Sequence, residues 1–231
     1  MEILTGKNIS KIYNKKNRKI TAVKNANISV NAGELIIIFG ISGSGKSTLL
    51  RILGTIEKPT TGELIIDSKN ITDTSYAELA KIRRHTISFV FQKHNLMPYL
   101  TVYENLLLRT AIAGIPKNEA KKRIEHELKE LNILNLIDRY PDEISAGQYQ
   151  RVAVARAIIT NPRIILADEP TAMLDENMAK TLMDILQKIA IERNCAIIMT
   201  STKTNILNYA TKMYEMKNGI LKLKQDVRNN G

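Results

Sequence analysis

The stretch from Glu34 to Ser47 reads ELIIIFGISGSGKS, and it decides the fold class. Its first half, Glu34 to Gly40, is a short apolar run that ends in glycine, which is typical of a strand inside a parallel sheet. Its second half, Gly40 to Ser47, matches the phosphate-binding pattern G-x-x-x-x-G-K-[ST] in full. A helical pattern from Lys46 to Leu53 follows at once. A strand, a glycine-rich turn and a helix in this order predict an α/β protein built around a phosphate loop.

The residues of this loop suit a nucleotide and its metal ion. The glycines let the backbone turn its N–H groups inward as an anion nest, next to the positive end of the following helix. The ammonium group of Lys46 would reach the β- and γ-phosphates, and the Ser47 hydroxyl would ligate Mg²⁺. We therefore expect the nucleotide-binding residues to include Gly40, Ser42, Gly43, Ser44, Gly45, Lys46, Ser47 and Thr48.

Two acids at the end of a second apolar run, RIILADEP, would complete the metal side of this site. Asp168 ends the run and can hold Mg²⁺ through water, and Glu169 suits a general base that polarises an attacking water. Adjacent acids at the end of a buried strand are costly unless a cation or water occupies the site. Without the phosphate loop, an ordinary turn before Pro170 would be the better interpretation.

The segment EISAGQYQRVAVARA forms the third feature. Ser145 and Gln148 have the spacing of a capping box, which predicts a helix start. Ala146 and Gly147 leave the N-terminal N–H groups of that helix accessible to an anion. The segment lies too far along the chain from Lys46 to belong to the same loop. On these residues alone, a plain helix start and an anion site both remain open.

Together, these features resemble an ABC-type ATPase subunit in order and spacing. The matching motifs are Gly40–Ser47 (Walker A), Gln92 (Q-loop), Ser145-Ala146-Gly147-Gln148 (signature), Asp168-Glu169 (Walker B) and Leu174-Asp175 (D-loop). The resemblance extends over nearly the whole chain. The stretch RRHTISFVFQKHNLMPYLTVYENL is similar to the MacB/LolD/FtsE-type branch, in which the permeases are usually separate chains.

The resemblance implies a P-loop NTPase fold with an ABC-type α/β core, a mixed sheet with a β-subdomain, and an inserted helical subdomain. It implies one ABC ATPase domain over 1–231, with the nucleotide-binding core in 1–91 and 150–231 and the helical subdomain in 92–149. The residue patterns agree with this. HTISFVFQ (85–92) and CAIIMT (195–200) predict strands, the period turns helical from about 101 to 140, and a long helix is expected from Ala179 to Glu192.

The resemblance also implies roles for individual residues. Two subunits would pack head to tail, so that Ser145 and Gly147 of one copy touch the γ-phosphate held by Lys46 of the other. Tyr13 would stack on adenine, and Gln92 would sense Mg²⁺ and the attacking water and pass its motion to a permease. The implied sets are Glu169, Gln92, Lys46 and Thr202 for catalysis, Ser47, Gln92 and Asp168 for the metal, and Ser145, Ala146, Gly147, Gln148 and Asp175 for the nucleotide of the second copy.

The chain departs from the family pattern at two places. Ala146 stands where the signature usually has its first glycine, which is a mild change if φ is negative. The family usually carries a histidine after the last core strand, whereas an ungapped count back from Gly219 puts Thr202 in that position and Lys203 in that of the following aspartate. A one-residue slip would put Ser201 there instead. A hydroxyl lacks the reach and the charge of imidazole, so we expect ATP binding with slow hydrolysis.

Composition limits the partners and the compartment. The sequence is 44% hydrophobic and 25% charged, which is typical of soluble globular proteins, and its one cysteine, Cys195, excludes an internal disulfide. The net charge of +11 indicates a polyanionic partner, although solvated surface charges explain it equally well. No N-terminal signal pattern occurs, and no apolar run approaches the about 18 residues of a membrane span. We expect a cytosolic protein, peripheral on the inner face of the cell membrane.

The leading hypothesis is the ATPase subunit of an exporter for lipoprotein, peptide or drug, bound to a permease and to a second copy of itself. A periplasmic, outer-membrane or lipoprotein partner would fit the same branch. An FtsE-like regulatory subunit with slow hydrolysis is the alternative. A nucleic-acid ATPase fits less well, since chromosome-maintenance relatives insert long coiled coils between phosphate loop and signature, and translation-type relatives carry two cassettes. We therefore expect no nucleic-acid partner.

Overall fold

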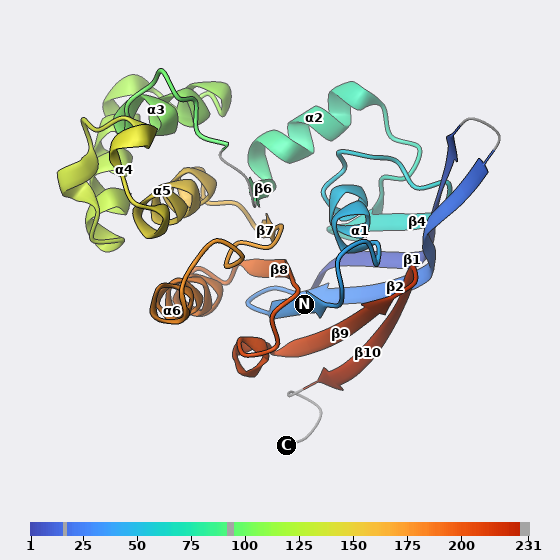
Figure 1. Ribbon diagram of the computed structural model, residues 1–231. Helices are drawn as coiled ribbons and strands as arrows, with labels where there is room; N and C mark the ends of the chain where they lie inside the picture. Colours follow the sequence, from blue (N-terminus) through green and yellow to red (C-terminus); the bar gives the residue numbers. More distant parts are fainter. Residues whose placement is uncertain (16–17, 92–94, 227–231) are drawn as a thin grey trace.

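The computed structural model describes residues 1–15, 18–91 and 95–226 (Figure 1). A six-stranded sheet, in the order β10-β9-β3-β8-β7-β6, forms its centre. Neighbouring strands run parallel except β10, which pairs antiparallel with β9. The strands are β3 (Leu35–Phe39), β6 (Ile87–Val90), β7 (Ile164–Ala167), β8 (Ala196–Ser201), β9 (Lys212–Lys217) and β10 (Ile220–Asp226).

The apolar run of β3 is buried on both faces of this sheet. Successive side chains of a strand point to opposite faces, and here Leu35 and Ile37 join one hydrophobic cluster while Ile36 and Ile38 join another. The first cluster contains apolar side chains of the helices on one face, and the second contains those of α1 (Lys46–Leu53) and of the second sheet. This explains why the run is continuous rather than alternating in polarity.

A second, antiparallel sheet covers the face that carries α1. Its strand order is β2-β1-β4-β5. The long strands β1 and β2 form one hairpin that extends beyond the rest of the sheet (Figure 1). The strands are β1 (Glu2–Lys15), β2 (Arg18–Asn31), β4 (Thr61–Ile66) and β5 (Lys69–Asn70).

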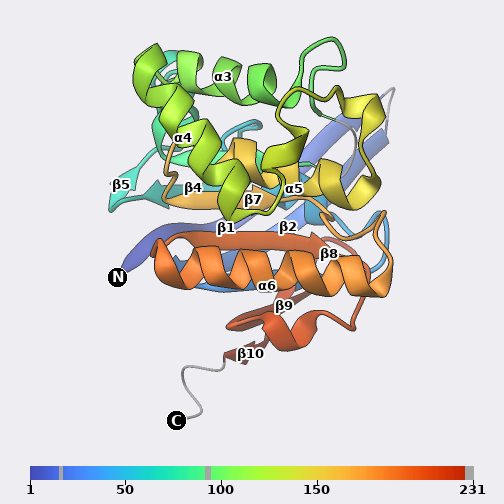
Figure 2. The ribbon, with the colours of Figure 1, turned by 90° about the vertical axis from the view of Figure 1, so that its left-hand side faces the viewer.

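The described residues form five further α-helices. Figure 1 shows α3, α4 and α5 together on one side of the molecule, and Figure 2 shows α6 running along β8. Among the helices of the described segments, none combines the length and the apolar character that crossing a bilayer requires. The helices are α2 (Tyr76–His85), α3 (Val102–Ile112), α4 (Lys117–Glu130), α5 (Ala146–Ile158) and α6 (Glu176–Glu192), with short 3₁₀ turns at Leu134–Leu136, Pro141–Glu143 and Leu207–Tyr209.

Most elements lie where the sequence predicts them, with three differences. The strand expected over 85–92 is shorter, Ile87–Val90, because His85 still belongs to α2, a helix that the sequence analysis missed. Only Leu79 of α2 is buried, so its apolar pattern is weak. Helix α6 begins at Glu176, before the expected Ala179, because Asp175 caps it. The division at 149/150 stays a prediction, and α5 crosses that boundary.

A buried ion pair joins the start of β3 to β9. The Lys212 Nζ lies 3.0 Å from Glu34 Oε1, and both side chains are almost completely buried. Glu34 Oε2 also accepts a hydrogen bond from the Asn31 backbone N–H at 2.7 Å. Each charge is therefore compensated inside the protein, and removing one of them would weaken the compensation of the other.

We expect Lys212→Met to lower the free energy of unfolding by about 3 kcal/mol, because it removes a cation that lies 3.0 Å from the buried Glu34 carboxylate. Urea denaturation measures this value. Lys222→Met, at an exposed lysine of the adjacent strand β10, is the matched control and should change stability by less than about 0.5 kcal/mol. If both substitutions lowered the free energy of unfolding equally, the buried ion pair would contribute no more to stability than an exposed lysine does.

Candidate active site

The phosphate loop connects β3 to α1 in a conformation that requires glycine. Gly43 and Gly45 have φ values of +75° and +107°, which L side chains rarely adopt. A Cβ on Gly45 would also lie 2.2 Å from the Ala22 carbonyl oxygen. Gly45 is the N-cap of α1 and offers no side-chain cap, so the first N–H groups of this helix remain for a ligand.

Lys46 spans the inside of this loop. Its side chain is only 3% exposed, and its Nζ donates hydrogen bonds to the carbonyl oxygens of Gly40 and Ile41 at 2.9 and 3.0 Å. The same Nζ lies 3.4 Å from Glu169 Oε1. The buried ammonium group is thus compensated by two carbonyls and one carboxylate, as a desolvated charge requires.

The two acids after β7 lie beside the loop, as their motif predicts. Asp168 Oδ1 accepts hydrogen bonds from Ser47 Oγ at 2.9 Å and from Thr200 Oγ1 at 2.7 Å. The Glu169 backbone N–H in turn donates to Thr200 Oγ1 at 2.9 Å. Glu169 has a φ of +45°, an uncommon conformation for a residue with a side chain. The hydroxyl of Thr200 therefore orients both acids, a role that the sequence analysis did not assign.

A cavity of about 510 Å³ opens over the loop. Besides the loop and Glu169, its walls include residues of β2 and the turn between β9 and β10, which the sequence analysis missed. That turn is tied to the loop, because the Gly219 N–H donates to the Ser44 carbonyl oxygen at 2.9 Å and the Gly219 oxygen accepts from Lys24 N–H at 2.8 Å. The added lining residues are Ile20, Thr21, Ala22, Lys24, Asn218 and Gly219.

The residues at this cavity fit a nucleoside triphosphate with a magnesium ion. Backbone N–H groups and the Lys46 ammonium group supply donors and positive charge for phosphate oxygens. The hydroxyl of Ser47 and the carboxylate of Asp168, whose oxygens lie 2.9 Å apart, are the hard oxygen ligands that Mg²⁺ prefers. Glu169 lines the same cavity, and a carboxylate can accept a proton from a water molecule.

Tyr13, the expected adenine partner, lies near the loop without lining this cavity. Its hydroxyl donates to Glu57 Oε2 at 2.5 Å and also interacts with the side chain of Thr48, which does line the cavity. Burial first, and then the Glu57 hydrogen bond, raise the pKa of Tyr13. The stacking role of Tyr13 remains a prediction.

The signature segment forms the predicted helix start. Ser145 and Gln148 make a reciprocal capping box, and Ser145 and Ala146 are exposed. Ala146 is the first residue of α5 and has no positive φ, so its methyl group fits without strain. Gly147 is buried against Met178, since a Cβ there would lie 2.9 Å from Met178 Sδ.

Asp175 also contacts Met178. Its side chain caps α6 by accepting a hydrogen bond from the Met178 N–H at 2.8 Å. The signature and the D-loop residue of one chain therefore meet at the start of α6. Within the part of the chain that the structure describes, the hydrogen bonds of Ser145, Gln148 and Asp175 do not reach the phosphate loop.

The end of β8 reaches the loop through its backbone. The Gly40 N–H donates to the Ser201 carbonyl oxygen at 3.2 Å. The Ser201 hydroxyl is buried and bonded to the backbone of Lys203, whereas Thr202 is exposed. Which of the two corresponds to the histidine of the family pattern stays a prediction. Gln92 lies outside the described residues.

Comparisons with known proteins agree with these motifs. The family model described as ABC transporter matches residues 23–172. The methionine import ATP-binding protein MetN 1 of Bacillus cereus is 42% identical over 201 residues, 87% of this chain and 58% of that protein. The lipoprotein-releasing system ATP-binding protein LolD of Rickettsia felis is 38% identical over 221 residues, 96% of this chain and 98% of that protein. This chain thus spans 58% of the length of the methionine import relative.

Solved structures share the fold. The dimeric MJ0796 cassette superimposes with a TM-score of 0.91 at 37% identity, covering 98% of this chain and 99% of that one. A dimeric post-hydrolysis state of MJ0796 bound to ADP and Pi gives 0.89 at 37% identity, covering 96% of this chain and 98% of that one. The predicted fold class, an ABC-type α/β core with a β-subdomain and an inserted helical subdomain, is confirmed, and the relatives agree with the LolD-type branch.

We expect Thr200→Val to lower the free energy of unfolding by about 1–3 kcal/mol, because the Glu169 N–H and the Asp168 carboxylate lose their shared hydroxyl. Valine keeps the branched shape of threonine, so packing in β8 is preserved. Urea denaturation measures the difference. Thr204→Val, at an exposed threonine beyond the strand, should stay within about 0.5 kcal/mol of wild type. The same cost at both positions would contradict the assigned role.

Proposed function

This chain belongs to the ABC transporter family, and we propose that it is the ATP-binding and ATP-hydrolysing subunit of a transporter that drives a separate membrane permease. The observation that carries the proposal is the contact chain from Lys46 to Glu169 and from Ser47 to Asp168, at 3.4 and 2.9 Å. It joins a phosphate loop, two hard metal ligands and a general base at one cavity. A structural ion pair alone would not need the glycine-rich loop around it.

Each residue then has a task in hydrolysis. The loop N–H groups and Lys46 would bind the β- and γ-phosphates. Ser47, Asp168 and Gln92 would hold Mg²⁺, which would neutralise charge on the phosphates. The γ-phosphate competes with Glu169 for the Lys46 ammonium group, whose present distance to that carboxylate is 3.4 Å. Glu169 is thereby freed to accept a hydrogen bond from the attacking water and then its proton.

A second copy of the chain completes the site. Ser145 and Ala146 are exposed at the N-terminal end of α5, and the side-chain hydrogen bonds of Ser145 and Gln148 in the described residues do not reach the phosphate loop of their own chain. Two exposed apolar side chains, Ile41 in the loop and Met173 before Asp175, are suited to burial between copies. In a head-to-tail dimer, ATP bound to one copy would contact the Ser145–Gln148 segment and Asp175 of the other. The dimeric MJ0796 cassette is similar over nearly the whole chain and supports this arrangement.

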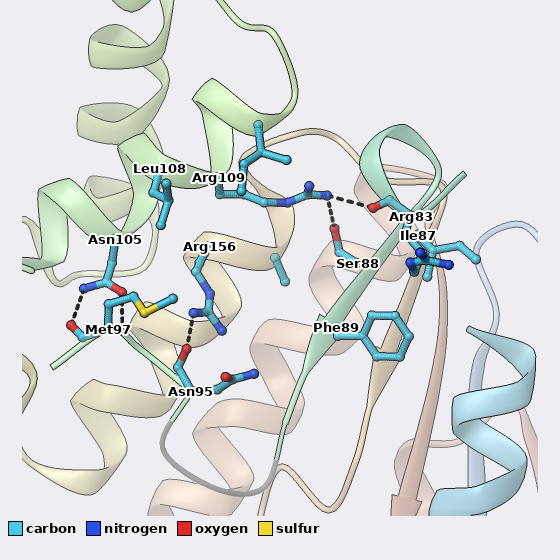
Figure 3. Close-up of a pocket in the computed structure, with 12 residues that line it drawn as sticks. Arg83, Ile87, Ser88, Phe89, Asn95, Met97, Asn105, Leu108, Arg109 and Arg156 are labelled. Carbon is cyan, nitrogen blue, oxygen red and sulfur yellow. Dashed lines mark hydrogen bonds between the residues drawn. The ribbon is translucent and has the colours of Figure 1, made fainter. Parts of the chain in front are cut away.

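A groove of about 300 Å³ between β6, α3 and α5 is our candidate for the permease contact (Figure 3). Asn95 and Met97, which follow Gln92 in the sequence, line it, and Arg156 donates to the Asn95 carbonyl oxygen there. The rim exposes apolar surface at Met97 and Leu108. Burial lowers the pKa of Arg109 and Arg156, so these cations are partly desolvated and favour an acidic or carbonyl-rich segment of the partner. A segment bound here would sense any movement around Gln92.

The permease determines the cargo and the direction of transport. One relative is named for methionine import and another for lipoprotein release. We propose the exporter type, on the resemblance of 83–106 to the LolD-type branch, with a periplasmic, outer-membrane or lipoprotein partner and no nucleic-acid partner. The FtsE-like regulatory alternative draws on one observation, the exposed hydroxyl of Thr202 in place of an imidazole. In either case the chain would lie in the cytoplasm at the inner face of the cell membrane.

The central experiment replaces the base and the phosphate-binding lysine. We expect Glu169→Gln to reduce ATP turnover at least about 100-fold, because proton transfer loses its acceptor. The phosphate loop is unchanged in this variant, so we expect it to bind ATP. Light scattering should then show an ATP-dependent dimer that persists. Lys46→Ala should lose both nucleotide binding and the dimer.

Glu192→Gln, at an exposed glutamate of the last turn of α6, is the matched carboxylate control and should hydrolyse ATP like wild type. The proposal fails if wild type has no turnover, or if Glu169→Gln keeps the wild-type rate.

Thr202→His should raise turnover about tenfold or more in the presence of the permease, because imidazole adds reach, charge and proton-transfer capacity. Steady-state ATPase assays check this. Thr204→His places the same ring two residues further along and should leave the rate unchanged. An unchanged or lower rate in Thr202→His would show that the threonine does not limit hydrolysis.

A further inference from the structure

Lys203 ties the end of β8 to the loop that follows Glu169. Its Nζ donates hydrogen bonds to the carbonyl oxygens of Thr171 and Leu174, at 3.1 and 3.0 Å. Lys203 is partly buried, and a charged donor makes stronger hydrogen bonds than a neutral one. This contact joins two segments that are far apart in the sequence, one directly after Glu169 and the other at the end of β8.

Ser201, two residues before Lys203, fixes the backbone conformation of Lys203. Ser201 is only 2% exposed, and its Oγ accepts the Lys203 N–H and donates to the Lys203 carbonyl oxygen, both at 2.9 Å. These two hydrogen bonds hold the backbone of Lys203 independently of the contact that its side chain makes with Thr171 and Leu174. Only the side-chain torsions remain to be ordered, which lowers the entropic cost of the contact.

The loop from Glu169 to Asp175 consists of two tight turns. The Ala172 N–H donates to the Glu169 oxygen at 3.1 Å, and the Leu174 N–H donates to the Thr171 oxygen at 3.2 Å. Thr171 and Leu174 are buried, whereas Met173 between them is 70% exposed. The loop is thus anchored on its inner side, where Lys203 binds, and presents its outer side to the surroundings.

The two ends of this loop are held by one strand end. Thr200 binds the Glu169 N–H, and Lys203 binds the last turn before Asp175. The family pattern has an aspartate at the position of Lys203. An ionised aspartate only accepts hydrogen bonds, so it could not bind two carbonyl oxygens in this way.

We propose that Lys203 is a positioning residue for ATP hydrolysis. Through the carbonyls of Thr171 and Leu174 it holds the loop that begins at the Glu169 carboxylate and ends at Asp175, the residue that would meet the nucleotide of the second copy. It touches no substrate itself. The inference rests on the proposed function, since it assigns Lys203 to the geometry of that same site.

The first test measures the loop without nucleotide. Hydrogen–deuterium exchange of the full chain should be at least about tenfold faster for the peptide covering 170–176 in Lys203→Met than in wild type. Lys203→Arg keeps a charged donor and should restore most of the protection. Lys180→Met, at an exposed lysine of α6, should leave exchange unchanged. Equal exchange in Lys203→Met and wild type would overturn the proposal.

The second test separates positioning from binding. We expect Lys203→Met to lower kcat about tenfold, because small displacements of catalytic groups are costly, while the affinity for a fluorescent ATP analogue stays within about twofold. Lys203→Arg should recover part of kcat. An unchanged kcat, or a loss of affinity as large as that of kcat, would overturn the proposal. If wild type lacks turnover, the proposed function fails and so does the catalytic role of Lys203, whereas the exchange measurement still decides the loop contact.

Discussion

The burial of one ammonium group constrains most of this structure. Lys46 lies almost completely inside the protein, so its charge must be compensated by the carbonyls of the loop and by Glu169. The carboxylate can stand there only because β7 ends beside the loop and Thr200 of β8 holds the Glu169 backbone. The parallel order of β3, β8 and β7 brings these three ends to one edge of the sheet. A single buried charge thus links the sheet topology to the composition of the site.

The sequence predicts those parts of the fold whose causes are local. The phosphate loop and helix α1 are specified by glycines at positive φ and by a short apolar strand, so their bounds follow from the residues. Contacts between distant segments were not predictable in the same way. The hydroxyl of Thr200, the turn at Gly219 and the missed helix α2 depend on neighbours that come together only in the folded chain. Their residue types, threonine, glycine and a weakly amphipathic run, are ordinary in loops and surfaces.

The candidate motifs divide into two groups in space. The Walker residues form one connected cluster, whereas the signature and the D-loop residue meet each other at Met178, at the start of α6. Sequence order alone could not reveal this separation, because motif spacing is the same whether partners belong to one chain or to two. The separation agrees with the proposed dimer, in which the exposed Ser145 and Ala146 would meet the nucleotide of the second copy. In the proposed dimer, contact between the two copies would be part of the chemistry rather than an addition to it.

The alternation of side chains along β3 has a structural consequence for the inserted helices. Leu35 and Ile37 belong to the same cluster as Val102 and Leu106 of α3 and Ile124 of α4, together with strand residues of β7 and β8. In the described residues, the apolar side chains of the helical block therefore share one core with the central sheet. As an isolated fragment, the helical block would expose its share of this apolar core to water and would be expected to aggregate. Any movement of these helices relative to the sheet would have to keep this shared apolar boundary closed, because full detachment would expose the common core.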